Sequence, residues 1–281
     1  IYYGIDCPYG DQSDPEISDA KYCINCGTEY EYDYHTYAHL GGFKCPKCGY
    51  KRHATDVAVT SVDKLTAKGT ELTMEFSDSA TGGPVPLSHK QEHVLVGLPA
   101  IYNVYNAVGA ICAYTAAGFE RADIIKSLAE TGTSFGRMET FKLDGVDVQM
   151  ILVKNPAGCN QAINYVTSIE EDKTVAVCLN DRTADGHDIS WIWDAEYERL
   201  AADNFLKKLI VSGDRAEDIA LRLKYGGMDE SRIEICKGWT NLVDKMKESK
   251  YPIFVLPNYT SMLALRKTLA DVTGAEEFWK G

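Results

Sequence analysis

Four cysteines near the start of the chain constrain its fold more than any other feature. They form two Cys-x-x-Cys pairs separated by eighteen residues: Cys23 with Cys26, and Cys45 with Cys48. Four thiolates at this spacing match the tetrahedral ligand set of a structural Zn²⁺ ion. A glycine follows each pair and permits a tight backbone turn around a metal. We therefore expect a four-cysteine zinc ribbon over residues 20–52, with two disulfides or a redox-active pair as the alternatives.

The charge of the chain argues against nucleic acid as a partner. Its 29 Lys and Arg residues face 41 Asp and Glu residues, for a formal net charge of −12. A surface of this sign repels a phosphate backbone, so we expect no nucleic-acid binding. The sequence contains no apolar run of the ~20 residues that a transmembrane helix needs and no signal peptide. The other five cysteines are scattered among apolar residues, which is typical of a reducing compartment.

The first half of the chain alternates apolar and polar residues, as half-exposed strands do. Residues 57–62, 71–76 and 93–96 have this pattern, and residues 101–118 and 121–128 have helical spacing. The chain opens with residues that read as the end of a strand, so we expect a piece of a longer protein. We place a first domain at residues 1–139, with the ribbon inserted in it.

The second half changes to short, almost continuous apolar runs separated by helical stretches. The expected strands are 150–153, 174–179, 189–192, 208–211, 232–235 and 252–256. The expected helices are 160–169, 194–203, 216–225, 240–248 and 262–270. This alternation predicts a Rossmann-like α/β domain over residues 140–281, with a mostly parallel sheet. Ligands of such sheets bind at the carboxyl ends of the strands.

Most candidate chemistry lies in those strand-end loops. Residues 180–194 hold four aspartates, one histidine and two tryptophans, which indicates either a functional site or a loop that caps itself. Lys154 and Asn155 follow an expected strand, and Arg137 lies on a loop near the domain junction, where it could bind phosphate. Asn103 and Asn106 stand one turn apart on an expected helix. No Gly-x-x-x-x-Gly-Lys phosphate loop occurs in the chain.

Several of these segments together resemble the Mur ligase family, most closely its MurT branch. Residues 97–110, with Asn103 and Asn106, resemble the helix start that contacts adenine in this family. Gly136-Arg137-Met138-Glu139 resembles the motif that opens the family's C-terminal domain, and residues 180–194 resemble the Asp-rich segment of MurT. An inserted four-cysteine ribbon is also a MurT trait. The resemblance implies that residues 1–139 are the end of a Mur-ligase central domain.

The resemblance further implies an ATP-dependent amidation in cell-wall synthesis. The α-carboxyl of D-glutamate in the lipid II stem peptide would be phosphorylated, and ammonia would displace the phosphate to give D-isoglutamine. The ammonia would come from a partner glutaminase of the GatD type, which has a cysteine and a histidine but no acidic third member. Asp185 matches the aspartate that completes this triad. Zn²⁺ would be structural, ATP and Mg²⁺ would bind in the longer protein, and the enzyme would work in the cytoplasm at the inner membrane face.

The chain departs from other Mur ligases in one motif. Ile151 and Lys154 stand where those enzymes have an aspartate and a histidine, so the nucleotide contacts of those two groups must be replaced, with Lys154 as the candidate. The expected nucleotide- or substrate-binding residues are Asn103, Asn106, Arg137, Lys154 and Asn155. The family's phosphate loop and Mg²⁺ ligands would precede residue 1, so we expect the isolated fragment to be inactive. Two other functions remain open. One is a Mur-like ligase that adds an amino acid, as poly-glutamate ligases do, and the other is a non-catalytic zinc-ribbon binding protein.

Overall fold

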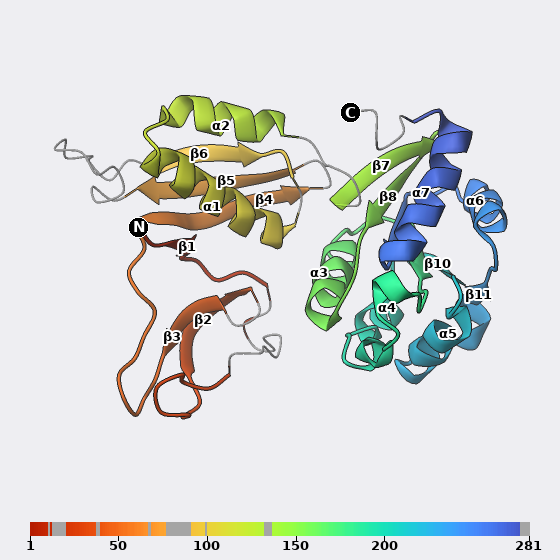
Figure 1. Cartoon of the computed structure of the whole chain (residues 1–281), viewed down its shortest axis with the longest axis horizontal. Helices are drawn as coiled ribbons and strands as arrows, with labels where there is room; N and C mark the ends of the chain where they lie inside the picture. Colours follow the sequence, from red (N-terminus) through yellow and green to blue (C-terminus); the bar gives the residue numbers. More distant parts are fainter. Residues whose placement is uncertain are drawn as a thin grey trace. The chain divides into compact units, whose positions relative to one another are not determined.

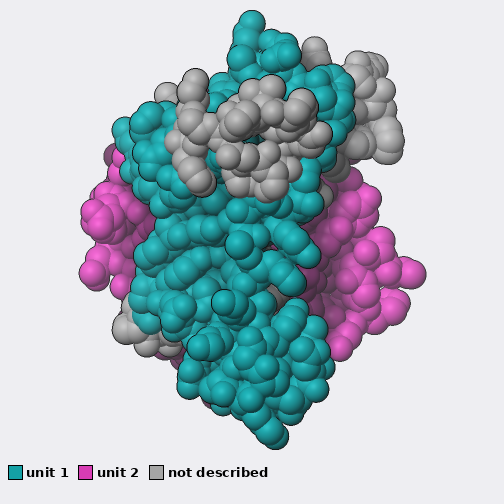
Figure 2. Space-filling model, turned by 90° about the vertical axis from the view of Figure 1, so that its left-hand side faces the viewer, with its two compact units in different colours: residues 1–132 teal, residues 133–281 magenta. Residues whose placement is uncertain are grey.

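The computed structural model describes residues 1–10, 12, 21–37, 40–66, 69–76, 91–98, 100–131 and 137–275. The chain divides into two compact units, residues 1–132 and 133–281, shown in separate colours in Figure 2. The domain boundary expected from the sequence lies seven residues later, between residues 139 and 140.

The first unit is built on a four-stranded sheet covered by two helices (Figure 1). Its strands lie in the order β1 (Tyr3–Ile5), β4 (Val57–Thr66), β5 (Gly69–Phe76) and β6 (Gln91–Val96). Helices α1 (Ile101–Ala116) and α2 (Arg121–Glu130) pack their apolar side chains against the sheet. The three strands and two helices expected here from periodicity are confirmed, because alternation and helical spacing report directly which side chains are buried.

A two-stranded ribbon interrupts this sheet in the sequence. Strands β2 (Glu31–Tyr37) and β3 (Leu40–Lys44) pair antiparallel and lie between β1 and β4 along the chain. Because β1 and β4 are parallel neighbours, their connection must cross from one end of the sheet to the other. Arg52 joins the ribbon to the sheet: Nη1 donates to Tyr34 Oη at 2.5 Å, and Nη2 lies 2.7 Å from Asp6 Oδ1.

The second unit contains a six-stranded sheet in the order β11-β10-β9-β12-β8-β7. Its strands are β7 (Arg137–Leu143), β8 (Val146–Ile151), β9 (Lys173–Cys178), β10 (Leu206–Ser212), β11 (Ile233–Ile235) and β12 (Ile253–Pro257). All neighbouring pairs are parallel except β7 with β8. The predicted mostly parallel sheet is therefore confirmed, with one antiparallel strand at its edge.

Helices cover both faces of this sheet (Figure 1). Helices α6 (Trp239–Lys247) and α7 (Tyr259–Thr273) pack on the face that includes Ala176, Ile210 and Val255. Helices α3 (Pro156–Thr167), α4 (Glu198–Ala202) and α5 (Ala216–Tyr225) cover the other face. Every residue of β9 is buried, as expected for a central strand between two helical layers.

One expected strand is wrong. Residues 189–192 do not join a sheet but lie at a short 3₁₀-helix, η3 (Ser190–Trp193), which packs beside α5. A short apolar run fits a buried strand and a buried helical turn equally well, so periodicity could not separate them. Two further 3₁₀ turns are η2 (Thr183–Asp185) and η4 (Glu230–Arg232).

None of the helices in the part of the chain that the structure describes is long and apolar enough to cross a membrane.

Candidate functional site

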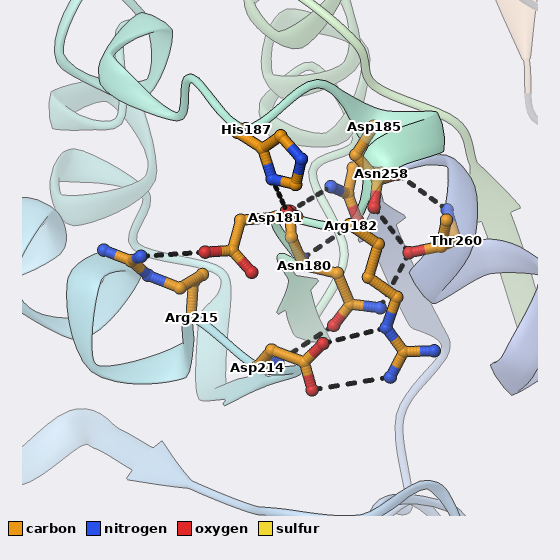
Figure 3. Close-up of polar contacts among 9 residues, drawn as sticks. All are labelled: Asn180, Asp181, Arg182, Asp185, His187, Asp214, Arg215, Asn258 and Thr260. Carbon is orange, nitrogen blue, oxygen red and sulfur yellow. Dashed lines mark hydrogen bonds and ion pairs between the residues drawn. The ribbon is translucent and has the colours of Figure 1, made fainter.

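The candidate site lies at the carboxyl ends of the parallel strands of the second unit. Four of these five strands end at Ile151, Cys178, Ser212 and Pro257, and each of the four is followed by a segment with polar residues. Hydrogen bonds and ion pairs join the loops after β9, β10 and β12 (Figure 3). The fold therefore brings the Asp-rich segment after β9 together with the loops after β10 and β12.

Two buried asparagines lock the loops together just beyond the strand ends. The Asn180 main-chain N–H donates to Asn258 Oδ1 at 3.1 Å, and Asn258 Nδ2 donates to the Asn180 carbonyl at 2.7 Å. Asn180 Oδ1 also accepts the Asp214 N–H at 2.9 Å. Asn180 is completely buried. The two amides thus hold the β9, β10 and β12 loops in one fixed arrangement after the sheet's own hydrogen bonds end.

Two arginines neutralise several of the acids in this region. Arg215 Nη1 lies 2.9 Å from Asp181 Oδ2, and Arg215 Nε lies 2.7 Å from Asp218 Oδ2. The hydrogen bonds from Arg215 lower the pKa of Asp218. Arg182 Nε donates to Asp214 Oδ2 at 2.9 Å. Part of the Asp-rich segment is therefore a structural network that ties the β9 and β10 loops to each other.

Asp185 has a different environment from these paired acids. It ends η2 and its side chain reaches the start of α7, where Oδ1 accepts the Thr260 N–H at 2.8 Å. Oδ2 accepts the Thr260 hydroxyl at 2.5 Å. The first N–H groups of a helix have no acceptor within the helix, and the Asp185 carboxylate accepts from one of them. Its negative charge is also stabilised by the positive end of the α7 dipole. Asp185 stays partly exposed.

Asp188 and His187 of the same loop are exposed. Asp188 Oδ1 accepts the Ser190 N–H at 2.8 Å. Hydrogen bonds from Ser190 lower the pKa of Asp188, and the bond from the hydroxyl has a larger effect than the bond from the main-chain N–H. His187 Nδ1 lies 2.8 Å from the carbonyl oxygen of Asp181, so this ring nitrogen is the donor. Both contacts are local and stabilise the shape of the loop.

Lys154 and Asn155 lie at the end of β8. Asn155 is the N-cap of α3, and its side-chain oxygen accepts the Gly158 N–H at 2.8 Å. Lys154 is exposed, and its ammonium lies 5.3 Å from the ring centre of Tyr259, the first residue of α7. The structure therefore places Lys154 beside the helix start that also holds Asp185. The roles of Lys154 and Asn155 in nucleotide or substrate binding stay predictions.

The other predicted nucleotide contacts do not belong to these strand-end loops. Asn103 is 5% exposed in α1 and Asn106 is exposed on the same helix, both in the first unit. Arg137 begins β7 in the second unit, but its side chain and Gly136 lie outside the described residues. Their binding roles also stay predictions.

The four cysteines of the ribbon form a compact cluster. Their sulfur atoms all lie within 4.8 Å of one another. The Cys23–Cys48 and Cys26–Cys45 sulfur pairs are each 3.5 Å apart, and both pairs join the two turns instead of staying within one. A tetrahedral Zn²⁺ with Zn–S bonds of about 2.3 Å places its ligands about 3.8 Å apart, whereas a disulfide requires about 2.05 Å. The donor set therefore fits a zinc ion better than disulfides or a redox-active pair.

Local backbone geometry supports the same conclusion. The Gly27 N–H donates to the Cys23 carbonyl at 2.8 Å, and the Gly49 N–H donates to the Cys45 carbonyl at 3.0 Å. These glycines have φ of +69° and +74°, a conformation that other residues rarely adopt. The two turns are equivalent, and each directs a pair of sulfurs to one point.

Three residues of the site, Thr260, Asn258 and Arg215, were not among the candidates expected from the sequence. Each lies 34 to 80 positions from the residue of the β9 loop that it contacts. The available signal was their position in polar segments directly after buried parallel strands, because the carboxyl ends of such strands line ligand sites.

Comparison with known proteins gives the chain relatives over almost its whole length. Residues 152–262 match the family described as MurT ligase C-terminal. The chain is 31% identical over 270 residues to the subunit MurT of lipid II isoglutaminyl synthase (glutamine-hydrolyzing) from Staphylococcus aureus, covering 96% of this chain and 57% of that protein. The subunit of the same name from Streptococcus pneumoniae is 28% identical over 272 residues, with the same coverage.

A solved structure supports the fold. The pseudomurein peptide ligase type C from Methanothermus fervidus superposes with a TM-score of 0.63 at 17% identity, covering 96% of this chain and 52% of that one. At this identity the likeness shows the Mur-ligase-like α/β fold alone. The chain spans 57% of the length of the curated relatives that it matches.

Proposed function

We propose that this chain, a homologue of the MurT subunits of lipid II isoglutaminyl synthase, belongs to the ligase subunit of a glutamine-dependent amidotransferase. The homology and the fold support an ATP-dependent ligase of peptidoglycan synthesis. The finer reaction is our proposal. The α-carboxyl of D-glutamate in the lipid II stem peptide takes the γ-phosphoryl group of ATP, and ammonia then displaces phosphate to leave D-isoglutamine.

The placement of Asp185 is the observation that carries the amidotransferase assignment. Its carboxylate is partly exposed, and both of its oxygens are already oriented by Thr260. A carboxylate has about four acceptor positions, so two remain for a donor from another protein. An acid in this position can accept the N–H of a partner's catalytic histidine, fix its tautomer and stabilise the imidazolium that forms during glutamine hydrolysis. We propose a GatD-type glutaminase as this partner.

Zn²⁺ has a structural role in this proposal. Cys23, Cys26, Cys45 and Cys48 hold it, and four sulfur ligands leave no open position for a catalytic water. ATP and Mg²⁺ belong to the ligase reaction, with Asn103, Asn106, Arg137, Lys154 and Asn155 as the proposed contacts in this chain.

The substitution Asp185→Asn in the full natural polypeptide, purified with its glutaminase, tests the proposal. Asparagine keeps an oxygen for the Thr260 N–H but removes the negative charge. We expect glutamine hydrolysis to fall by about 10³- to 10⁴-fold, as for other triads whose acid becomes an amide. Amidation of lipid II supplied with free ammonium should continue at the wild-type rate, because that step does not use the triad.

Asp188→Asn is the matched control. Asp188 lies three residues away on the same loop, and asparagine can still accept its hydrogen bond from Ser190. This variant should keep both activities. Unchanged glutamine-dependent amidation in Asp185→Asn would refute the role of Asp185, and amidation with an amino acid as the only donor would favour the amino-acid ligase instead.

A further inference from the structure

Thr260 contacts Asp185 through two groups at once. It is the second residue of α7, and its N–H and its hydroxyl donate to different oxygens of the same carboxylate, at 2.8 and 2.5 Å. Two donors on two oxygens fix the plane of a carboxylate as well as its position. Figure 3 shows both contacts.

Asn180 determines the direction of the Thr260 hydroxyl. Asn180 Oδ1 accepts the Asp214 N–H at 2.9 Å, so the other end of this amide is the NH₂ group. Asn180 Nδ2 donates to Thr260 Oγ1 at 2.9 Å. A threonine hydroxyl has one proton. Because the Thr260 oxygen accepts from Asn180, this proton points to Asp185 Oδ2. The chain of donors therefore runs in one direction, from a completely buried asparagine to the carboxylate.

The main chain around Asp185 gives the side chain little other support. The η2 turn contains only three residues, and it is closed by the hydrogen bonds from Asp185 N to Arg182 O and from Gly186 N to Thr183 O. Gly186 follows with φ of +80°. A residue on so short a turn needs a second support if its carboxylate is to meet another protein's imidazole in one geometry.

We propose that Thr260, held by Asn180, is a positioning residue that orients the Asp185 carboxylate for the histidine of the glutaminase. This inference rests on the proposed function, because it assigns a role to Thr260 only if Asp185 acts in the triad. Thr260 acts through Asp185 and does not touch the glutamine substrate. Its loss should therefore lower kcat for glutamine hydrolysis and leave KM for glutamine unchanged.

The test compares Thr260→Val with Thr260→Ser in the complex of the full natural polypeptide and its glutaminase. Valine has the shape of threonine but no hydroxyl, and it keeps the backbone N–H. We expect kcat for glutamine hydrolysis to fall about tenfold or more, the effect of removing one hydrogen bond to a charged group. Serine keeps the hydroxyl and should restore kcat to within about twofold of wild type.

Thr268→Val on the same helix is the matched control. Thr268 is also half-buried, and among the described residues its hydroxyl donates only to the Ala264 carbonyl of its own helix, at 3.2 Å. This variant should keep wild-type hydrolysis. Ammonium-supported amidation and the affinity for the glutaminase should change little in all three variants. The melting temperature should fall only in Thr260→Val, because valine leaves the buried Asn180 Nδ2 without its acceptor.

The double variant Asp185→Asn/Thr260→Val separates positioning from a general structural effect. If Thr260 acts only through Asp185, the double variant hydrolyses glutamine as slowly as Asp185→Asn alone. Wild-type kcat in Thr260→Val, with loss of activity in Asp185→Asn, would overturn the inference and leave the proposed function intact. An equal loss of ammonium-supported amidation would also overturn it, because a misfolded unit would then be the cause. Unchanged hydrolysis in Asp185→Asn would refute the proposed function itself.

Discussion

Replacing Cys45 with alanine should unfold the ribbon while the rest of its unit stays folded. Between residues 21 and 52, in the part that the structure describes, the buried apolar side chains are Cys23 and Cys45, two of the proposed zinc ligands. The largest side chains packed there are the half-buried aromatic residues Tyr30, Phe43 and Tyr50, which form too small a cluster to replace a lost metal. We expect Cys45→Ala to lose bound zinc, because three ligands no longer complete the tetrahedral site.

The expected effect is large on the scale of local stability. Structural zinc contributes about 10–16 kcal/mol to the folding of ribbon-sized peptides. If Cys45→Ala lost only about 2 kcal/mol of this, the population of open ribbon would rise about 30-fold. The amides of Gly27 and Gly49, which donate to the Cys23 and Cys45 carbonyls, report this opening directly.

Hydrogen exchange followed by mass spectrometry, together with metal analysis, measures the result. Wild type should hold about one zinc per chain and protect the two turns, whereas Cys45→Ala should hold none and exchange there more than about 30-fold faster. Strands β4 and β5 should keep their protection. Cys112→Ala is the control, since Cys112 is a buried cysteine of α1 outside the cluster. The reasoning is wrong if Cys45→Ala retains zinc, or if its turns exchange at the wild-type rate.

Two further predictions concern the second unit. Lys173 is completely buried, and its ammonium lies 2.8 Å from the Asp203 carboxylate. Lys173→Met should therefore lower the free energy of unfolding in urea by about 3–5 kcal/mol, because it leaves a buried carboxylate unpaired. The double variant Lys173→Met/Asp203→Asn should recover much of that loss, and a loss below about 1 kcal/mol in the single variant would contradict the prediction. The pKa of Asp218, lowered by Arg215, lies below its ordinary 3.8 in the folded state, so its stabilisation is present above about pH 4 and is lost as the pH falls through the lowered value. The difference in melting temperature between wild type and Asp218→Asn should therefore shrink below pH 4, and a constant difference would refute this.

The sequence predicted the layers of the second unit well, because buried parallel strands leave a strong signal. The apolar runs of β9, β10 and β12 are continuous, and their lengths exclude long helices. Strand β7 was missed for a physical reason. Its buried residues are Met138, Phe141 and Leu143. Met138 and Phe141 are three positions apart, whereas buried residues of a regular half-exposed strand are two positions apart. The register shifts there and Met138 has φ of +64°, as at a β-bulge, so the alternation that identifies a strand is broken.

The site was predictable in its location but not in its connections. The rule that ligands bind at the carboxyl ends of parallel strands correctly placed residues 180–188 and Lys154 at the same edge of the sheet. Periodicity could not show that Asn258 faces Asn180, 78 positions away, or that Thr260 faces Asp185. Those contacts depend on strand order: β9 lies between β10 and β12 in space, although β10 and β11 intervene in sequence between β9 and β12. No local pattern carries that information.

The connections explain why the acids of one loop differ in what they can do. Asp181 already has a cationic partner in Arg215, and Asp188 holds the turn at Ser190. A carboxylate engaged by a guanidinium attracts a second cation much less strongly. Asp185 receives its hydrogen bonds from Thr260, a neutral residue, so these bonds orient the carboxylate without cancelling its charge. A triad acid needs this combination, because it must be aimed in advance and still attract an imidazolium when one forms. This distinction favours Asp185 over Asp181 as the residue presented to the proposed glutaminase, whereas Asp188, whose partner Ser190 is also neutral, differs from Asp185 in bonding only within its own turn.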